Sequence, residues 1–193
     1  MLFPPYQTAL QLSHVFIDGL WPGAQVVDAT LGNGNDTRIL AGKVGETGHV
    51  WAFDIQEEAI ARCRTRIASW DIGDRVTLIH DSHHHIRQYI HSPLDCVVFN
   101  LGWLPGDDRP PAERTTTQWE TTRIALSDSL TLLNSTGLLL VCIYPGHEEG
   151  AHELQGLQEW SAALDNRMYS AMWMHFPNHA ANAPHLLLVQ RMV

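Results

Sequence analysis

Short apolar runs alternate along the chain with longer segments in which apolar positions recur every three or four residues. A short run that ends at turn residues is typical of a strand, and the longer spacing is typical of an amphipathic helix. The short runs predict strands at residues 25–30, 49–55, 75–80, 94–101, 137–145, 169–176 and 185–191. The longer segments predict helices at residues 36–44, 56–70, 116–133 and 148–164, the first of them capped by Asp36.

This order of elements predicts a particular kind of sheet. Strands that alternate with helices pair in parallel through right-handed crossovers and carry helices on both faces. Only a short turn rich in Pro and Asn separates the last two strands, which favours an antiparallel pair. The chain of 193 residues fits a single domain. We therefore predict an α/β fold, a doubly wound, mostly parallel seven-stranded Rossmann-like sheet with an antiparallel C-terminal strand.

Composition and charge narrow the classes of protein that fit. Apolar residues make up 45% of the chain, enough for a core, and no apolar run approaches the roughly 18 residues of a membrane helix. The N-terminus shows no secretory pattern and the three cysteines lie far apart, so we expect reduced thiols and a cytoplasmic protein. The net charge of −9, with a single lysine, counts against a broad nucleic-acid-binding face but not against a local one.

Polar residues follow the ends of the predicted strands, the edge at which such sheets bind ligands. The loops at this edge begin at Asp28, Asp54, Asp81, Asn100 and Pro145. Any one of these residues could merely cap the next helix. An acid at the end of the second strand, about 20 residues after a glycine loop, normally binds ribose hydroxyls. Asp54 therefore predicts a ligand that contains a nucleoside.

The glycine loop DATLGNGNDT, residues 28–37, lets a ligand approach the backbone but has no lysine for a phosphate. The third glycine of the dinucleotide fingerprint is also missing. S-adenosyl-L-methionine has a carboxylate that suits helix-start amides, and an ammonium and a sulfonium that suit Asp and Asn oxygens. We therefore expect this cofactor. A nicotinamide-dependent oxidoreductase is the alternative, although the chain lacks a Tyr-x-x-x-Lys pair.

The segment NLGWLPGDD, residues 100–108, closes the fourth predicted strand. The Asn100 oxygen can accept a hydrogen bond from a substrate amine, and Trp103 can stack on a base. Amine methyltransferases that act on nucleic-acid bases use a comparable turn, with two prolines between the Asn or Asp and the aromatic residue. On these residues alone, a strand-ending turn with a buried tryptophan explains the segment slightly better.

Taken in order, the motifs resemble those of one family. The segments DATLGNGNDT, FDIQ, DSH, FNLGWLPGDD, YPGHEEGAHE and APHLLLVQR are similar to those of a small class I methyltransferase family first described as rRNA methylases. That family is now associated with 5-aminomethyl-2-thiouridine at the tRNA wobble position. The resemblance covers nearly the whole chain. The family usually has tyrosine at the position of Trp103 and a second glycine at the position of Asp107.

The resemblance implies methyl transfer from S-adenosyl-L-methionine to the exocyclic amine of that uridine. The substrate would be the anticodon stem-loop of tRNA, and the enzyme a homodimer. Asn100 would bridge the cofactor and the acceptor amine, and Trp103 and Asp107 would lie at the substrate. A methyltransferase of rRNA or of a small amine is the nearest alternative, and a binding module without catalysis is another.

Position along the chain assigns the cofactor contacts. The methionine part is expected to meet Asp28, Gly32, Asn33, Gly34, Asn35 and Asp36. The ribose is expected at Asp54 and Gln56, and the adenine at Asp81, Ser82 and His83.

The acceptor amine sets a chemical demand. An aliphatic amine has a pKa of about 10.4, and only its neutral form attacks a methyl group. A desolvated site beside the sulfonium lowers that pKa, and a proton acceptor helps further. His147, Asp107 and Asp108 are candidate acceptors, although His147 fits a turn-capping role equally well.

Two further groups of residues carry alternatives. Arg109 and Arg114 could meet anticodon phosphates or could be solvated arginines balanced by neighbouring acids. The segment HDSHHH, residues 80–85, invites a metal site, but consecutive histidines point in different directions and no metal-binding motif is present. We therefore expect no metal.

Overall fold

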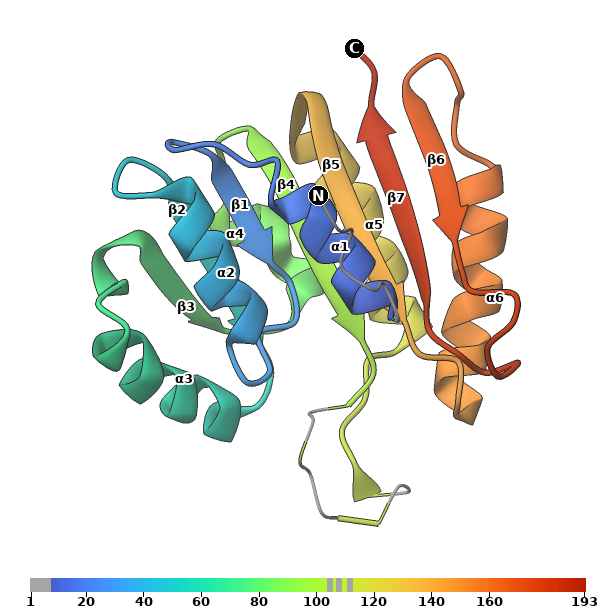
Figure 1. The fold of residues 1–193 in the computed structure, drawn as a ribbon, viewed down its shortest axis with the longest axis horizontal. Helices are drawn as coiled ribbons and strands as arrows, with labels where there is room; N and C mark the ends of the chain where they lie inside the picture. The colour runs from blue at the N-terminus through green and yellow to red at the C-terminus, as the bar shows by residue number, and fades with distance from the viewer. Residues whose placement is uncertain (1–7, 104–105, 107–108, 111–112) are drawn as a thin grey trace, which may run out of the picture.

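The computed structural model describes residues 8–103, 106, 109–110 and 113–193. Over these residues the chain forms a seven-stranded sheet in the order β3-β2-β1-β4-β5-β7-β6 (Figure 1). The strands are β1 Gln25–Asp28, β2 His49–Asp54, β3 Val76–His80, β4 Leu94–Leu101, β5 Leu133–Ile143, β6 Tyr169–Met174 and β7 His185–Arg191. Strands β1 to β5 pair in parallel, whereas β7 is antiparallel to both of its neighbours. The predicted doubly wound sheet with an antiparallel C-terminal strand is confirmed.

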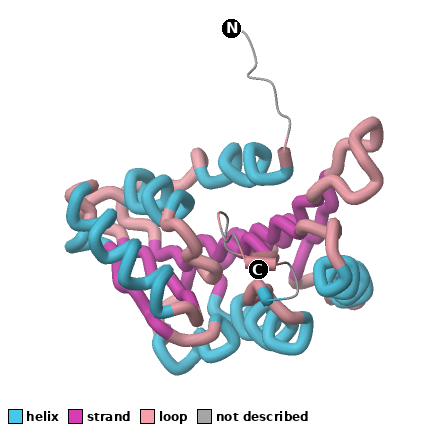
Figure 2. The backbone as a smooth tube through the Cα atoms, turned by 90° about the horizontal axis from the view of Figure 1, so that it is seen from below, coloured by secondary structure: helices cyan, strands magenta, loops and turns pink. Residues whose placement is uncertain are grey.

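Helices cover both faces of the sheet (Figure 2). One face carries α1 Ala9–Ile17, α2 Asn35–Val44 and α3 Glu57–Ser69, and the other carries α4 Ile86–Tyr89, α5 Trp119–Leu132 and α6 Glu148–Ala162. Successive strand residues point to opposite faces, so Val26 joins the core on one side and Val27 the core on the other. Both side chains are fully buried, as a parallel sheet between two helix layers requires. No helix in the described part of the chain is both long and apolar enough to span a membrane.

Parallel pairing brings the carboxyl ends of β1 to β5 to one edge of the sheet, the lower edge in Figure 1. The polar loops predicted from the sequence all leave the sheet there. Two short 3₁₀ turns, η1 Gly73–Arg75 and η2 His83–His85, flank β3, and η2 leads from this edge into α4.

The helix boundaries differ from the prediction at the glycine loop. Helix α2 begins at Asn35, and its N-cap is Gly34 in a left-handed conformation, with no side-chain cap. The prediction that Asp36 caps this helix is therefore wrong. The Asp36 carboxylate instead forms a hydrogen bond with His14, which lies on a helix that the sequence pattern does not predict. That helix, α1, is capped by Thr8, whose hydroxyl accepts a hydrogen bond from the Gln11 amide at 3.1 Å.

Strand β5 also begins earlier than predicted, at Leu133 rather than at residue 137. Leu133 pairs with Leu94 across an irregularity in β4, and the preceding helix α5 ends at Leu132. Because Leu133 is 1% exposed, tertiary burial rather than local pattern sets this boundary.

Candidate active site

A cavity of about 910 Å³ opens at the carboxyl edge of the sheet, within the size range of small-molecule sites. Residues predicted for the cofactor and for the substrate line the same cavity. These are Gly32, Asn35, Asp36, Asp54, Gln56, Asp81, Ser82, His83, Asn100, Trp103, Arg114 and His147. Asp28, Asn33, Gly34 and Arg109 lie outside the lining, and Asp107 and Asp108 lie outside the described residues.

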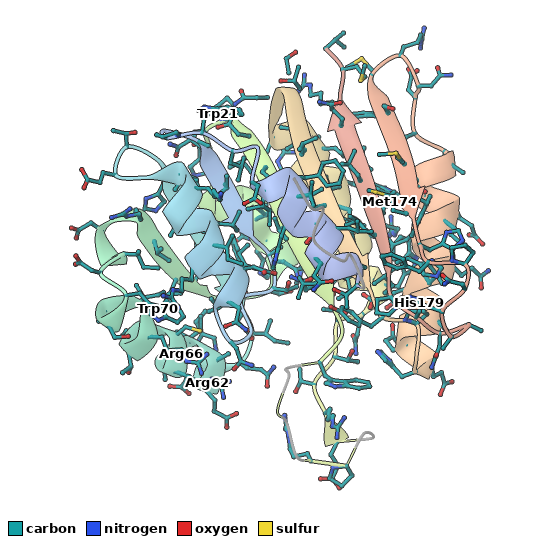
Figure 3. All side chains as sticks on the ribbon, in the orientation of Figure 1. Trp21, Arg62, Arg66, Trp70, Met174 and His179 are labelled. Atoms are coloured by element: carbon teal, nitrogen blue, oxygen red, sulfur yellow. The ribbon has the colours of Figure 1, made fainter. Side chains whose placement is uncertain are left out.

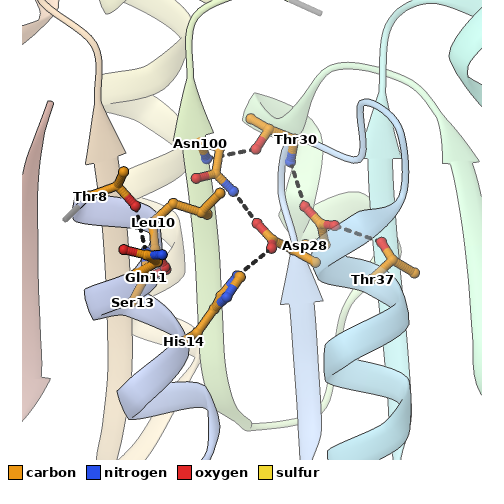
Figure 4. A network of polar contacts seen from close by, with 10 residues as sticks. Thr8, Leu10, Gln11, Ser13, His14, Asp28, Thr30, Thr37 and Asn100 are labelled. Atoms are coloured by element: carbon orange, nitrogen blue, oxygen red, sulfur yellow. Dashed lines mark hydrogen bonds and ion pairs between the residues drawn. The ribbon is translucent and has the colours of Figure 1, made fainter. Parts of the chain in front are cut away.

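Asp28 lies beneath the glycine loop rather than at its surface. Its side chain is fully buried and accepts hydrogen bonds from the Thr37 hydroxyl at 2.6 Å and the Thr30 amide at 3.2 Å. Burial, reinforced by the nearby Asp36 carboxylate, raises the pKa of Asp28 to about 7. This geometry therefore does not support the predicted contact between Asp28 and the methionine part of the cofactor. Asp28 ties β1 to α2 and supports the loop from below (Figure 4).

The loop glycines Gly32 and Gly34 are constrained by different surroundings. Both have positive φ, +51° at Gly32 and +76° at Gly34, where other residues are strained. A Cβ at Gly34 would lie 2.9 Å from the Cys63 sulfur, so this position is fixed by packing against α3. Gly32 lines the cavity and donates its amide to Asp54 Oδ2 at 2.9 Å. The neighbouring Asn33 faces α3, and its carbonyl accepts a hydrogen bond from Arg66 at 2.8 Å.

Asp54 ends β2 inside the cavity with both of its oxygens anchored. Oδ1 accepts from the Gln56 amide at 2.8 Å and Oδ2 from the Gly32 amide. Burial raises the pKa of Asp54, while the two backbone donors act in the opposite direction. Each oxygen keeps a further lone pair, so the carboxylate can accept two ribose hydroxyls without moving. Ile55 beside it is 53% exposed and lines the cavity, which gives an apolar surface for a base.

The HDSHHH segment divides its histidines among separate partners. His85 Nδ1 bonds to Asp81 at 2.9 Å, and His84 Nδ1 bonds to the Ser82 hydroxyl at 2.7 Å. The Asp81 pKa is lowered: burial acts to raise it, and the hydrogen bonds from His85, Tyr89 and the Ser82 amide outweigh that effect. The described residues contain no group of three or more His, Cys, Asp or Glu side chains placed to hold a metal ion.

His83 turns inward as a neutral hydrogen-bond acceptor. Nδ1 lies 3.2 Å from the Ala29 carbonyl, which can only accept, so this nitrogen carries the proton. Burial lowers the pKa of His83 to about 4. Nε2 is buried at the cavity and has no partner among the described residues. The lone pair of Nε2 is therefore free to accept a ligand N–H, such as an adenine amine.

Asn100 ends β4 with its side-chain amide held in one orientation (Figure 4). Nδ2 donates to Asp36 Oδ2, and His14 Nε2 lies 2.8 Å from Asp36 Oδ1. The hydrogen bond to Asp36 raises the pKa of His14 against the opposing effect of burial. The Asn100 backbone amide donates to the Thr30 hydroxyl at 2.7 Å. Asn100 Oδ1 remains buried without a partner among the described residues.

Trp103 forms an aromatic wall with His147. Their ring centroids lie 4.5 Å apart, and the Arg114 guanidinium lies 5.1 Å from the Trp103 ring centroid. Trp103 is only partly buried, so the strand-ending turn does not bury its tryptophan in the core. The arginines separate: Arg114 lines the cavity, whereas Arg109 is exposed and its carbonyl accepts from Arg114 Nε at 2.8 Å.

His147 is the N-cap of α6 as well as a cavity residue. Its Nδ1 accepts a hydrogen bond from the Gly150 amide at 3.0 Å, so in the neutral ring the proton is on Nε2. Burial lowers the pKa of His147 against the opposing effect of Glu149. A ring with Nδ1 occupied and Nε2 protonated is a donor and a stacking surface, not a proton acceptor. The capping interpretation is therefore correct, and the role of general base is disfavoured.

Several cavity residues carry no signal in the sequence that predicts a role for them. Thr115 to Thr117 and Gln118 line it from the segment before α5, and Thr121 lines it from the first turn of α5. Leu10 lines it from α1, and Asn182 and Pro184 line it from the β6–β7 connection. The Thr116 hydroxyl is buried without a partner, like Asn100 Oδ1 and His83 Nε2. In the described part of the chain, every such unpartnered side-chain atom belongs to a residue that lines this cavity. Buried polar atoms normally have partners, so this concentration indicates a polar ligand.

Comparison with known proteins agrees with this geometry. Residues 50–190 match the model of the family described as "Putative rRNA methylase". A Clostridium thermocellum protein structure of the same description is 38% identical, with a TM-score of 0.92 over 98% of this chain and 100% of that one. A Streptococcus mutans methyltransferase structure in complex with SAH is 30% identical, with a TM-score of 0.86 over 97% of this chain and 100% of that one.

A curated relative carries a more specific name. The chloroplastic tRNA (mnm(5)s(2)U34)-methyltransferase of Arabidopsis thaliana is 30% identical in an alignment over 168 residues that covers 81% of this chain. The match spans only 60% of the length of that relative.

The residues present fit S-adenosyl-L-methionine. Asp54 offers carboxylate oxygens for a ribose, His83 Nε2 offers an acceptor for the adenine amine, and Gly32 and Asp36 bring a close backbone and a carboxylate to the methionine end. The match over residues 50–190, the sheet order and this donor set agree with one another. The chain belongs to the rRNA methylase family, a family of S-adenosyl-L-methionine-dependent methyltransferases.

Proposed function

We propose that the protein methylates the exocyclic amine of 5-aminomethyl-2-thiouridine at the wobble position of tRNA. S-adenosyl-L-methionine supplies the methyl group on a sulfonium, whose positive charge favours the neutral form of a nearby amine. The resemblance to the Arabidopsis tRNA methyltransferase supports this substrate, and the cavity supplies chemistry that suits it.

The orientation of Asn100 carries the proposal. Because its Nδ2 is committed to Asp36, the unpartnered Oδ1 is the side-chain atom of Asn100 that is left to accept a hydrogen bond from a ligand. A primary amine has N–H groups to donate and a single lone pair to direct at the methyl carbon. An acceptor fixed on one side therefore aligns the nitrogen without occupying that lone pair. Leaving such a buried acceptor empty costs free energy, which a bound amine recovers.

The aromatic wall of Trp103 and His147 suits a flat substrate. Trp103, stacked beside His147, presents a ring on which a thiouridine base can lie. His147 can donate from Nε2 to an oxygen or sulfur of the base. Holding the base fixes the distance between its aminomethyl group and Asn100.

An acidic protein needs local positive charge to bind RNA. Arg62 and Arg66 of α3 lie along the same lower edge as the loop after β4 (Figure 3), and Arg114 lines the cavity itself. These guanidinium groups are candidates for contacts with the phosphates that flank the methylated nucleotide. The homodimer and the cytoplasmic location remain predictions.

The test is methyl transfer with labelled S-adenosyl-L-methionine to tRNA that lacks only this methyl group, followed by mass spectrometry of the nucleosides. We expect one methyl on the 5-aminomethyl-2-thiouridine nucleoside and none on rRNA from the same cells. Transfer to rRNA alone would make the rRNA interpretation the correct one. Saturable cofactor binding without turnover on either RNA would favour the alternative that the protein is a binding module without catalysis.

A further inference from the structure

Helix α6 carries a carboxylate that lies outside the cavity and outside the roles assigned above. Glu153 belongs to the YPGHEEGAHE motif, yet its side chain is fully buried. It accepts hydrogen bonds from the Thr117 hydroxyl at 2.7 Å and the Thr122 hydroxyl at 2.8 Å, one on each oxygen. Burying a carboxylate on neutral hydroxyls costs stability, so an apolar residue here would be cheaper for folding alone.

The Thr117 hydroxyl connects this carboxylate to the wall of the cavity. A hydroxyl has one proton, and Thr117 donates it to Glu153, so its lone pairs are left to accept. They accept the Gly102 amide at 2.9 Å, and the Thr117 amide donates back to the Gly102 carbonyl at 3.1 Å. Gly102 has a φ of +143°, a backbone conformation that glycine adopts readily and other residues rarely adopt.

The residue after Gly102 is Trp103, which also pairs with Thr116 through an isolated bridge. Helix α6 therefore holds the aromatic wall at two points. His147, the cap of α6, contacts the Trp103 ring, and Glu153 in the same helix controls the backbone just before it through Thr117.

We propose that Glu153 is a positioning residue, which sets the Thr117 hydroxyl to hold Gly102 and thereby fixes Trp103 against the acceptor. This inference rests on the proposed function, because the acceptor is the group that Trp103 would hold. Burial also raises the pKa of Glu153 to about 7, with the opposing effect of the two hydroxyls too small to prevent it.

The chain offers a matched set of variants. Glu153→Met removes both acceptors at nearly constant length, and Glu153→Gln keeps one acceptor oxygen. Thr117→Val cuts the link to Gly102, whereas Thr122→Val removes an equivalent hydrogen bond from the same carboxylate without touching that link. Glu159→Met is the control for Glu153→Met, because it makes the same substitution at an exposed glutamate of α6.

Two readouts separate this inference from the proposed function. The first is hydrogen exchange of the Gly102 amide by NMR, which needs no activity. We expect exchange roughly tenfold faster in Glu153→Met and Thr117→Val, partial recovery in Glu153→Gln, and no change in Thr122→Val or Glu159→Met. The second is turnover on tRNA, which should fall roughly tenfold in Glu153→Met and in Thr117→Val, with the cofactor dissociation constant unchanged. The double mutant of these two residues should lose no more turnover than either single variant.

Unchanged Gly102 exchange in Glu153→Met would overturn the inference, and so would equal losses of turnover in Thr117→Val and Thr122→Val. If Glu153→Met does not fold, the two threonine variants still decide. A wild-type protein inactive on tRNA would contradict the proposed function while leaving the exchange experiment decisive for Glu153.

Discussion

The two halves of the cavity are built in different ways. The cofactor half rests on bonds between the adjacent strands β1 and β2 and the loops that follow them: Asp54 holds the backbone of Gly32, and Asp28 ties the loop to Thr37. The acceptor half joins segments far apart in the chain, such as Gly102 to Glu153 through Thr117. We therefore expect the cofactor half to be largely preformed, whereas the acceptor half depends on how helix α6 packs. Substitutions should therefore separate cofactor binding from turnover.

The largest effect is expected in stability against pH. The Glu153 pKa is about 7 in the folded protein and about 4.5 when unfolded, so the folded state keeps a proton that the unfolded state loses. The stabilisation is full below pH 4.5 and is lost as pH rises to 7. Glu153→Gln should thus gain up to about 3 kcal/mol in free energy of unfolding, relative to wild type, between those pH values.

Urea unfolding of both proteins at a series of pH values measures this difference. The Asp28 pKa is also raised, so wild type alone reports both groups, and only the difference isolates Glu153. A constant difference across the range would show that Glu153 is ionised throughout.

Removing the ribose acceptor should affect the cofactor half alone. Asp54→Ala deletes both oxygens that are predicted to accept the ribose hydroxyls, and it releases the Gly32 amide. We expect the cofactor dissociation constant to rise roughly 100-fold, about 3 kcal/mol, by calorimetry. Asp74→Ala, at an exposed acid of η1, is the control and should leave binding unchanged. Cofactor affinity equal to wild type in Asp54→Ala would remove the ribose assignment.

Removing the amine acceptor should act on the other half. Asn100→Ala takes away the unpartnered Oδ1, and turnover on tRNA should fall roughly 30-fold, about 2 kcal/mol. Cofactor affinity should change by less than about threefold, because the ribose and adenine contacts remain. Asn178→Ala, in the exposed β6–β7 connection, serves as the comparison. A parallel loss of affinity and turnover would place Asn100 on the cofactor only.

The smallest effect divides the two roles of His147. His147→Asn can still cap α6 but loses the ring beside Trp103, whereas His147→Ala loses both. We expect His147→Ala to be about 1 kcal/mol less stable than His147→Asn, with turnover lowered about equally in the two. Thermal unfolding and kinetics with tRNA measure the pair. Normal turnover in His147→Asn would show that His147 caps α6 and that its ring does not contribute to turnover.

The contrast between the halves also explains what the sequence could predict. That Asp54 lines the cavity can be predicted from the sequence, because it ends a strand that the apolar pattern locates directly. The same holds for the place of Asn100 at the cavity, near the carboxyl end of β4. His14 was missed because its contact with Asp36 needs a short helix to dock across the sheet edge. No local pattern encodes that docking.

Asp28 and Glu153 show a second limit. Both carboxylates lie in motifs that point to function, yet both are fully buried and act on loops rather than on ligand. A sequence does not distinguish an acid that faces a cavity from one that lies beneath it. The distinction follows from which side of the loop the neighbouring helices cover, and that is set by tertiary packing.

The central claim is that the buried acceptor at Asn100 receives an amine on a wobble uridine. The most direct measurement is single-turnover methyl transfer to two anticodon stem-loops that differ only at this base, one with 5-aminomethyl-2-thiouridine and one with 2-thiouridine. The account predicts a single methyl on the amine nitrogen of the first and none on the second, with the transfer reduced in Asn100→Ala. Absence of a methyl on the first stem-loop, in a preparation that binds the cofactor saturably, would contradict it.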